Sequence, residues 1–69
     1  MEIKGYRVLT LAEIDLINEI KNYGETLGML IDTMRDRKGL DQRWISIGAT
    51  DLQTGLMALT RAVAQPTTF

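Results

Sequence analysis

The sequence predicts an all-α fold, an antiparallel two-helix hairpin with a short N-terminal arm that assembles with copies of itself into a homo-oligomeric helical bundle. Two long stretches carry apolar residues at helical spacing without an interrupting proline, and a short glycine-containing segment separates them. The chain has 69 residues, of which 45% are hydrophobic, and it contains neither cysteine nor histidine. Because a core of this size is marginal and neither disulfides nor zinc can supplement it, oligomerisation is the remaining source of stability.

The first helix is expected over about residues 10–37, after an extended arm at residues 1–9. Thr10 and Glu13 have the spacing of a capping box, in which each side chain bonds a free amide of the first helical turn. Gly39 is expected to end the helix in a left-handed conformation. One side of the helix carries its apolar residues, which are Leu16, Ile17, Ile20, Leu27, Leu30, Ile31 and Met34.

The second helix is expected over about residues 43–64, between a turn at 38–42 and a tail at 65–69. Asp41 is its predicted N-cap and Pro66 forbids its continuation. One apolar strip is expected to pack on the first helix and comprises Ile45, Ala49, Leu52, Leu56, Leu59 and Val63. A second strip comprises Trp44, Ile47, Gly55, Ala58 and Ala62. Together the strips span roughly 200°, about twice the usual apolar arc, so the second predicts contact with another subunit.

The composition excludes several classes of function. Eight basic and nine acidic residues give a net charge of −1, which makes long nucleic acid a poor partner. No apolar run is long enough to span a membrane and no signal peptide is visible, so a cytoplasmic protein without a membrane partner is expected. Without histidine, cysteine or a nucleophile motif, neither an enzyme, a metal site nor a cofactor is expected. Asp32 and Asp36 lie beside Arg35 and Arg37 and are interpreted as a salt-bridged helix end.

Three features of the sequence leave two interpretations open. Lys21, Gly24 and Gly28 follow one line of the first helix, where two interior glycines cost about 2 kcal/mol relative to alanine. They indicate either close packing of helices or a bare groove beside an ammonium group, suited to a flat phosphate-bearing ligand. Tyr6 either anchors the arm or stacks on a nucleobase, and Arg61 is either a solvent-exposed cation or part of a ligand site.

The chain resembles a known family over essentially its whole length, in the stretches KGYRVLT, INEIKNYGETLG, DQRWISIGATDLQTGLMALTRAVAQP and TTF. These stretches are similar to the phage anti-CBASS cyclic-nucleotide sponges and to the related hairpin domain of anti-Thoeris sponges. The resemblance implies a homohexamer that sequesters cyclic oligonucleotide messengers without degrading them, so that the CBASS effector is not activated. It implies a phage anti-defence protein that acts in the cytoplasm of the infected bacterial host.

The resemblance also implies two kinds of site. Tyr6 and Lys21 match the residues that bind cyclic dinucleotides between protomers, the tyrosine by stacking on a base and the lysine by meeting phosphate. Arg7 and Arg61, with Thr67 and Thr68, are carried over to a separate site for cyclic trinucleotides. The alternative that the sequence leaves open is a small helical adaptor that binds a host protein through its apolar strip.

Overall fold

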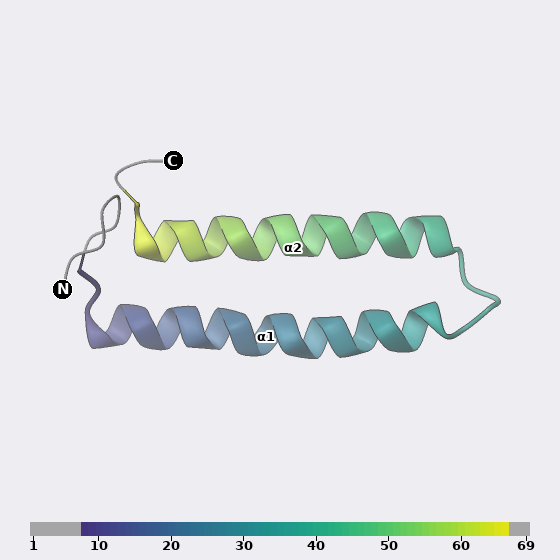
Figure 1. Ribbon diagram of the computed structural model, residues 1–69, viewed down its shortest axis with the longest axis horizontal. Helices are drawn as coiled ribbons and strands as arrows, with labels where there is room; N and C mark the ends of the chain where they lie inside the picture. Colours follow the sequence, from purple (N-terminus) through teal and green to yellow (C-terminus); the bar gives the residue numbers. More distant parts are fainter. Residues whose placement is uncertain (1–7, 67–69) are drawn as a thin grey trace.

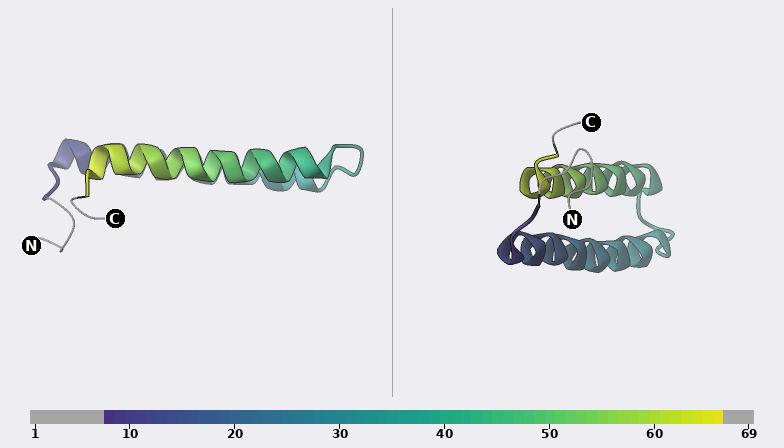
Figure 2. Two further views of the ribbon diagram at one scale, coloured as in Figure 1. Left: turned by 90° about the horizontal axis from the view of Figure 1, so that it is seen from above. Right: turned by 60° about the vertical axis from the view of Figure 1, so that its left-hand side comes forward.

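The structure is a computed structural model that describes residues 8–66. These residues form two α-helices and no strand: α1 spans Leu11–Arg35 and α2 spans Gln42–Ala64. The helices run antiparallel along most of their length, with the turn at one end and the start of α1 and the end of α2 at the other (Figure 1; Figure 2). The predicted all-helical hairpin is therefore confirmed.

The start of α1 is fixed by the predicted capping box. The Glu13 amide donates to the Thr10 hydroxyl oxygen at 3.2 Å, and the Thr10 amide donates to Glu13 Oε1 at 2.9 Å. The end differs from the prediction, because α1 stops at Arg35 and Asp36 caps it in a right-handed conformation. The Arg37 amide then reaches back to the Met34 carbonyl at 3.1 Å. Since this tight turn closes the helix first, the left-handed role predicted for Gly39 is wrong, and its φ lies outside that region.

The start of α2 depends on Asp41, as predicted. Asp41 Oδ1 accepts hydrogen bonds from the amides of Arg43 at 3.1 Å and Trp44 at 3.2 Å. The helix ends when Gln65 turns left-handed, with φ 45° and ψ 60°, while its amide still donates to the Arg61 carbonyl at 2.7 Å. Pro66 follows and has no amide hydrogen with which to continue the helix.

Replacing the α2 cap tests this account of the turn. Asp41→Ala removes the acceptor for two backbone amides and should lower the free energy of unfolding by about 1 kcal/mol. The decrease is measured as an earlier thermal transition of the helical circular dichroism signal. Asp15→Ala, in the middle of an exposed helical surface, is the control and should leave the transition within about a degree. An equal shift in both variants would mean that the cap contributes nothing specific.

The core between the two helices is very small. Among the described residues only Ile45 and Ala49 of α2 are buried, and α1 contributes no buried residue. Ile20, Leu27 and Ile31 of α1 and Leu56 of α2 are half-buried against the opposite helix. The first apolar strip of α2 therefore packs on α1 as predicted, except that Leu52 is 39% and Leu59 55% exposed. Twelve large hydrophobic side chains remain exposed, so one hairpin alone leaves much apolar surface in water.

Candidate functional site: two opposite faces of the hairpin

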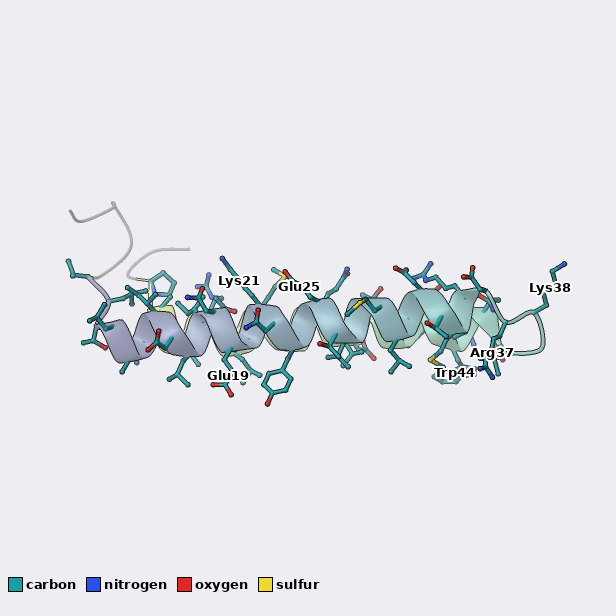
Figure 3. All side chains as sticks on the ribbon, turned by 90° about the horizontal axis from the view of Figure 1, so that it is seen from below. Glu19, Lys21, Glu25, Arg37, Lys38 and Trp44 are labelled. Carbon is teal, nitrogen blue, oxygen red and sulfur yellow. The ribbon has the colours of Figure 1, made fainter. Side chains whose placement is uncertain are left out.

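A pair of helices side by side presents two broad faces, and these faces differ in chemistry. Figure 3 shows Lys21 and Glu25 projecting to one side of α1, whereas Glu19 and Trp44 project to the other. We call these the Lys21 face and the Trp44 face, after the residues that line the groove on each. Aliphatic side chains line the grooves of both faces. The Lys21 face adds several charged and amide side chains, whereas the groove of the Trp44 face adds the Trp44 ring and a single charged residue among those described, Asp41.

A cationic groove lies on the Lys21 face toward the open end of the hairpin. It has a volume of about 370 Å³, and its lining residues are Ile20, Lys21, Gly24, Leu56, Met57, Thr60 and Arg61. Lys21 comes from the third turn of α1 and Arg61 from the last turn of α2, and the antiparallel arrangement brings them to one groove. Since the described residues of its lining include two cations and no carboxylate, this Lys21 groove suits an anion such as a phosphate.

The two glycines of α1 have different surroundings. A Cβ atom at Gly24 would lie 3.4 Å from Leu56 Cδ1, an ordinary packing distance, whereas a Cβ at Gly28 would meet nothing within 4 Å. Packing inside the hairpin therefore requires a glycine at neither position, because an added Cβ makes an ordinary contact at Gly24 and no contact at Gly28. In front of Gly28 a second groove of about 300 Å³ opens on the same face. It shares Gly24 and Leu56 with the Lys21 groove, so the two grooves are adjacent.

The second groove, here called the Gly28 groove, contains three polar residues, Asp32, Arg35 and Gln53. The sequence predicts a salt-bridged helix end for two of them and assigns no role to the third. The predicted salt bridges between Asp32 or Asp36 and the neighbouring arginines are absent from the described residues, although Asp32 and Arg35 line the same groove. Gln53 carried no sequence signal, since an exposed glutamine on α2 has no distinctive spacing.

The predicted site residues are only partly within the described chain. Lys21 and Arg61 line the same groove, although the resemblance assigns them to ligands of different ring size. Tyr6, Arg7, Thr67 and Thr68 lie outside the described residues. The start of α1 and the end of α2 lie together at the end of the hairpin opposite the turn (Figure 1).

The Trp44 face carries an apolar groove of about 340 Å³. Leu30 and Met34 of α1, Leu40 of the turn, and Trp44 and Leu52 of α2 contribute most of its apolar lining. Trp44 is 61% exposed, and the Arg43 guanidinium lies 5.7 Å from the centroid of its ring. Of the second apolar strip of α2, only Trp44 is among the described residues that line this groove. Gly55, Ala58 and Ala62 are exposed on other parts of α2, as predicted, whereas Ile47 is half-buried. A solvent-exposed apolar groove of this kind indicates a surface for another protein chain.

Two further properties concern residues 8–66. In this part of the chain, no three histidine, cysteine, aspartate or glutamate side chains gather closely enough to hold a metal ion. Neither α1 nor α2 combines the length and the apolar character needed to cross a membrane.

Comparisons with known proteins place these features in a family. Residues 1–64 match the family model described as "Acb2/Tad1, hairpin domain". The chain is also similar to Anti-CBASS protein 2 of Pseudomonas phage JBD67, with 32% identity over an alignment that covers 94% of this chain and 92% of that relative. The match includes both helices and the turn, and so it covers both faces of the hairpin. This chain is therefore a member of the Acb2/Tad1 hairpin family.

Proposed function

We propose that this protein is a phage anti-CBASS sponge that binds cyclic oligonucleotide messengers and holds them without cleavage, so that the host effector stays inactive. The name of the phage relative supports an anti-CBASS role. The observation that carries the proposal is the Lys21 groove, in which two cations from opposite helices converge without a carboxylate. Such a groove attracts the phosphodiester groups of a cyclic oligonucleotide.

In the proposed site for cyclic dinucleotides, Lys21 donates charge-assisted hydrogen bonds to a phosphate and Tyr6 stacks on a base. Stacking contributes roughly 1–3 kcal/mol per base. Lys21 lies about 16 Å along the helix axis from Thr10, at 1.5 Å per residue. Unless the arm folds back along its own helix, a ligand that contacts both residues lies between protomers, with Tyr6 from one copy and Lys21 from its neighbour.

Assembly into a homohexamer forms part of the proposal. The chain exposes 5819 Å² of accessible surface. A compact monomer of this mass is expected to expose about 4,400 Å². The excess is nearly twice the roughly 800 Å² that one partner contributes to an interface of standard size. An area sufficient for two such contacts supports a closed oligomer larger than a dimer, and the Trp44 face is the most apolar surface available for it.

A sponge does not require catalytic groups, and its effect depends on its abundance because each site removes one messenger. The Lys21 groove has no histidine, cysteine or carboxylate among its lining residues to act as a general base. The proposed place of action is the cytoplasm of the infected host, where the messenger is made.

A second candidate function is a helical adaptor that sequesters a host protein, and the exposed Trp44 groove is the observation that favours it. One experiment distinguishes the candidates. The protein is incubated with cyclic dinucleotide, separated from unbound ligand and heated, and the released nucleotide is identified by chromatography. A sponge returns the intact nucleotide and an enzyme returns a linear product. An adaptor retains no nucleotide.

Arg61 is proposed to serve cyclic trinucleotides, together with Arg7, Thr67 and Thr68. Arg61→Ala should weaken cyclic trinucleotide binding about tenfold or more, because a charge-assisted contact to phosphate is lost, while cyclic dinucleotide affinity stays within a few fold. Isothermal titration with both ligands measures the difference. An equal loss of affinity for both ligands would mean that Lys21 and Arg61, which line the same groove, form one site.

A further inference from the structure

The Gly28 groove lies beside the Lys21 groove but differs from it in charge. The Lys21 groove has two cations and no carboxylate, whereas the Gly28 groove contains Asp32 together with Arg35. The opposite charges of Asp32 and Arg35 compensate each other, and the Asp32 carboxylate repels a phosphate. A dianionic ligand therefore places its phosphates at Lys21, and a neutral part of the ligand is favoured beside Gly28.

The polar groups of the Gly28 groove are those that recognise the edge of a nucleobase. None of the side chains of Asp32, Arg35 and Gln53 has a hydrogen bond or ion pair with another described residue. A carboxylate accepts hydrogen bonds from N1–H and the 2-amino group of guanine. A guanidinium donates two parallel hydrogen bonds to guanine O6 and N7. A carboxamide can both donate to and accept from the edge of a base. Adenine presents an acceptor at N1, which the carboxylate cannot bond.

Gly28 supplies the space that a flat ring requires. It costs α1 about 1 kcal/mol relative to alanine. No atom of the hairpin lies within 4 Å of the place that a Cβ would take, so packing within the chain gives no reason for the glycine. Gly28 is seven residues from Lys21, about 10 Å along the axis. One nucleotide spans a comparable distance from its phosphate to the far edge of its base.

We propose that the Gly28 groove is a base-reading subsite, which takes a guanine base of a cyclic dinucleotide while Lys21 holds the adjoining phosphate. Asp32 is the specificity-determining residue, Arg35 and Gln53 bond the remaining base edge, and the bare backbone at Gly28 lets the ring lie against α1. This subsite rests on the proposed function and adds to it a preference for guanine over adenine.

The test is calorimetric titration of the oligomeric full-length protein with cyclic di-GMP and cyclic di-AMP. The parent should bind cyclic di-GMP more tightly. Asp32→Asn should lower the affinity for cyclic di-GMP about tenfold, which is the effect expected for the loss of one good base contact. The affinity for cyclic di-AMP should change by no more than about twofold. Because this substitution removes a negative charge, a general electrostatic effect would raise the affinity for both anions. A loss confined to guanine therefore identifies a base contact.

Gly28→Ala provides a second, independent variant. The added methyl group meets no atom of the hairpin, so the thermal transition should be unchanged or higher, yet cyclic di-GMP affinity should fall about tenfold or more. Gly39→Ala is the matched control, since it adds the same methyl group at an open position in the turn, and it should leave affinity unchanged.

Three results would overturn the subsite. One is an equal response of both ligands to Asp32→Asn, and another is a parent that prefers cyclic di-AMP. The third is a Gly28→Ala variant that sediments as a smaller species, because another copy would then occupy the groove. These results leave cyclic dinucleotide binding itself intact. If the parent binds neither nucleotide, the proposed function fails and the subsite fails with it.

Discussion

Lys21→Ala should weaken cyclic dinucleotide binding by about ten- to hundredfold, because it removes the ammonium group that lines the Lys21 groove and meets phosphate in the proposed site. The side chain projects outward on the Lys21 face and packs on no buried residue, so the oligomer should keep its mass (Figure 3). Isothermal titration measures the loss and sedimentation velocity measures the mass. Lys38→Ala removes the same charge in the turn, far from the groove, and should bind like the parent.

A mixing experiment tests whether the site lies between protomers. Tyr6→Ala should also lose about ten- to hundredfold in affinity, since stacking is removed. When the Tyr6→Ala and Lys21→Ala variants are refolded together, some sites should combine an intact Tyr6 with an intact Lys21 and regain binding. Mixed oligomers that recover no binding would place both residues in one chain. Parent-like binding by both single variants would instead favour the adaptor.

Gly55→Glu should separate the oligomer into hairpins, because it places a charge in the second apolar strip of α2, where we propose that another copy packs. Gly55 has open space at its Cβ position in the single hairpin, so the substitution does not clash within the chain. Burying an unpaired carboxylate in an apolar contact costs several kcal/mol, enough to dissociate an interface of standard size at micromolar concentration. The expected result is sedimentation at the mass of one subunit, with helical circular dichroism retained at low temperature.

Thr54→Glu is the matched control for this prediction. It introduces the same charge one residue earlier, about 100° around the axis of α2 from Gly55, at an exposed position that is not itself a member of the second strip. Its oligomer should have the parent's mass. If Gly55→Glu remains fully assembled as well, the second strip is not a contact between copies, and the exposed Trp44 groove would need another partner.

The sequence predicts those parts of the fold that local chemistry determines. The Thr10 and Glu13 capping box and the Asp41 cap both depend on hydrogen bonds within a few residues, and both are present. Gly39 shows where such reasoning fails. Several residues near the end of α1 could terminate the helix. The hydrogen bond from the Arg37 amide to the Met34 carbonyl, three residues earlier, closes the helix before Gly39 is reached.

The grooves depend on a relation between the helices that periodicity alone does not contain. Helical spacing gives the direction of each side chain around its own axis, but the register between the helices decides that Lys21 lies near Arg61 and that Gly28 lies near Gln53. The turn sets this register, and its length follows from how α1 ends. The roles of Tyr6, Arg7, Thr67 and Thr68 are still predictions that rest on the resemblance.

The placement of the turn has a consequence for how the molecule opens. In an antiparallel hairpin, contacts beside the turn close short loops, whereas contacts at the other end close the longest loop and cost the most chain entropy. Formation of the pair therefore proceeds from the turn outward, and fraying begins where α1 starts and α2 ends. Lys21 and Arg61 line a groove toward that fraying end. A messenger bound there would hold together the least stable part of the hairpin, so ligand affinity and local helix stability would rise and fall together.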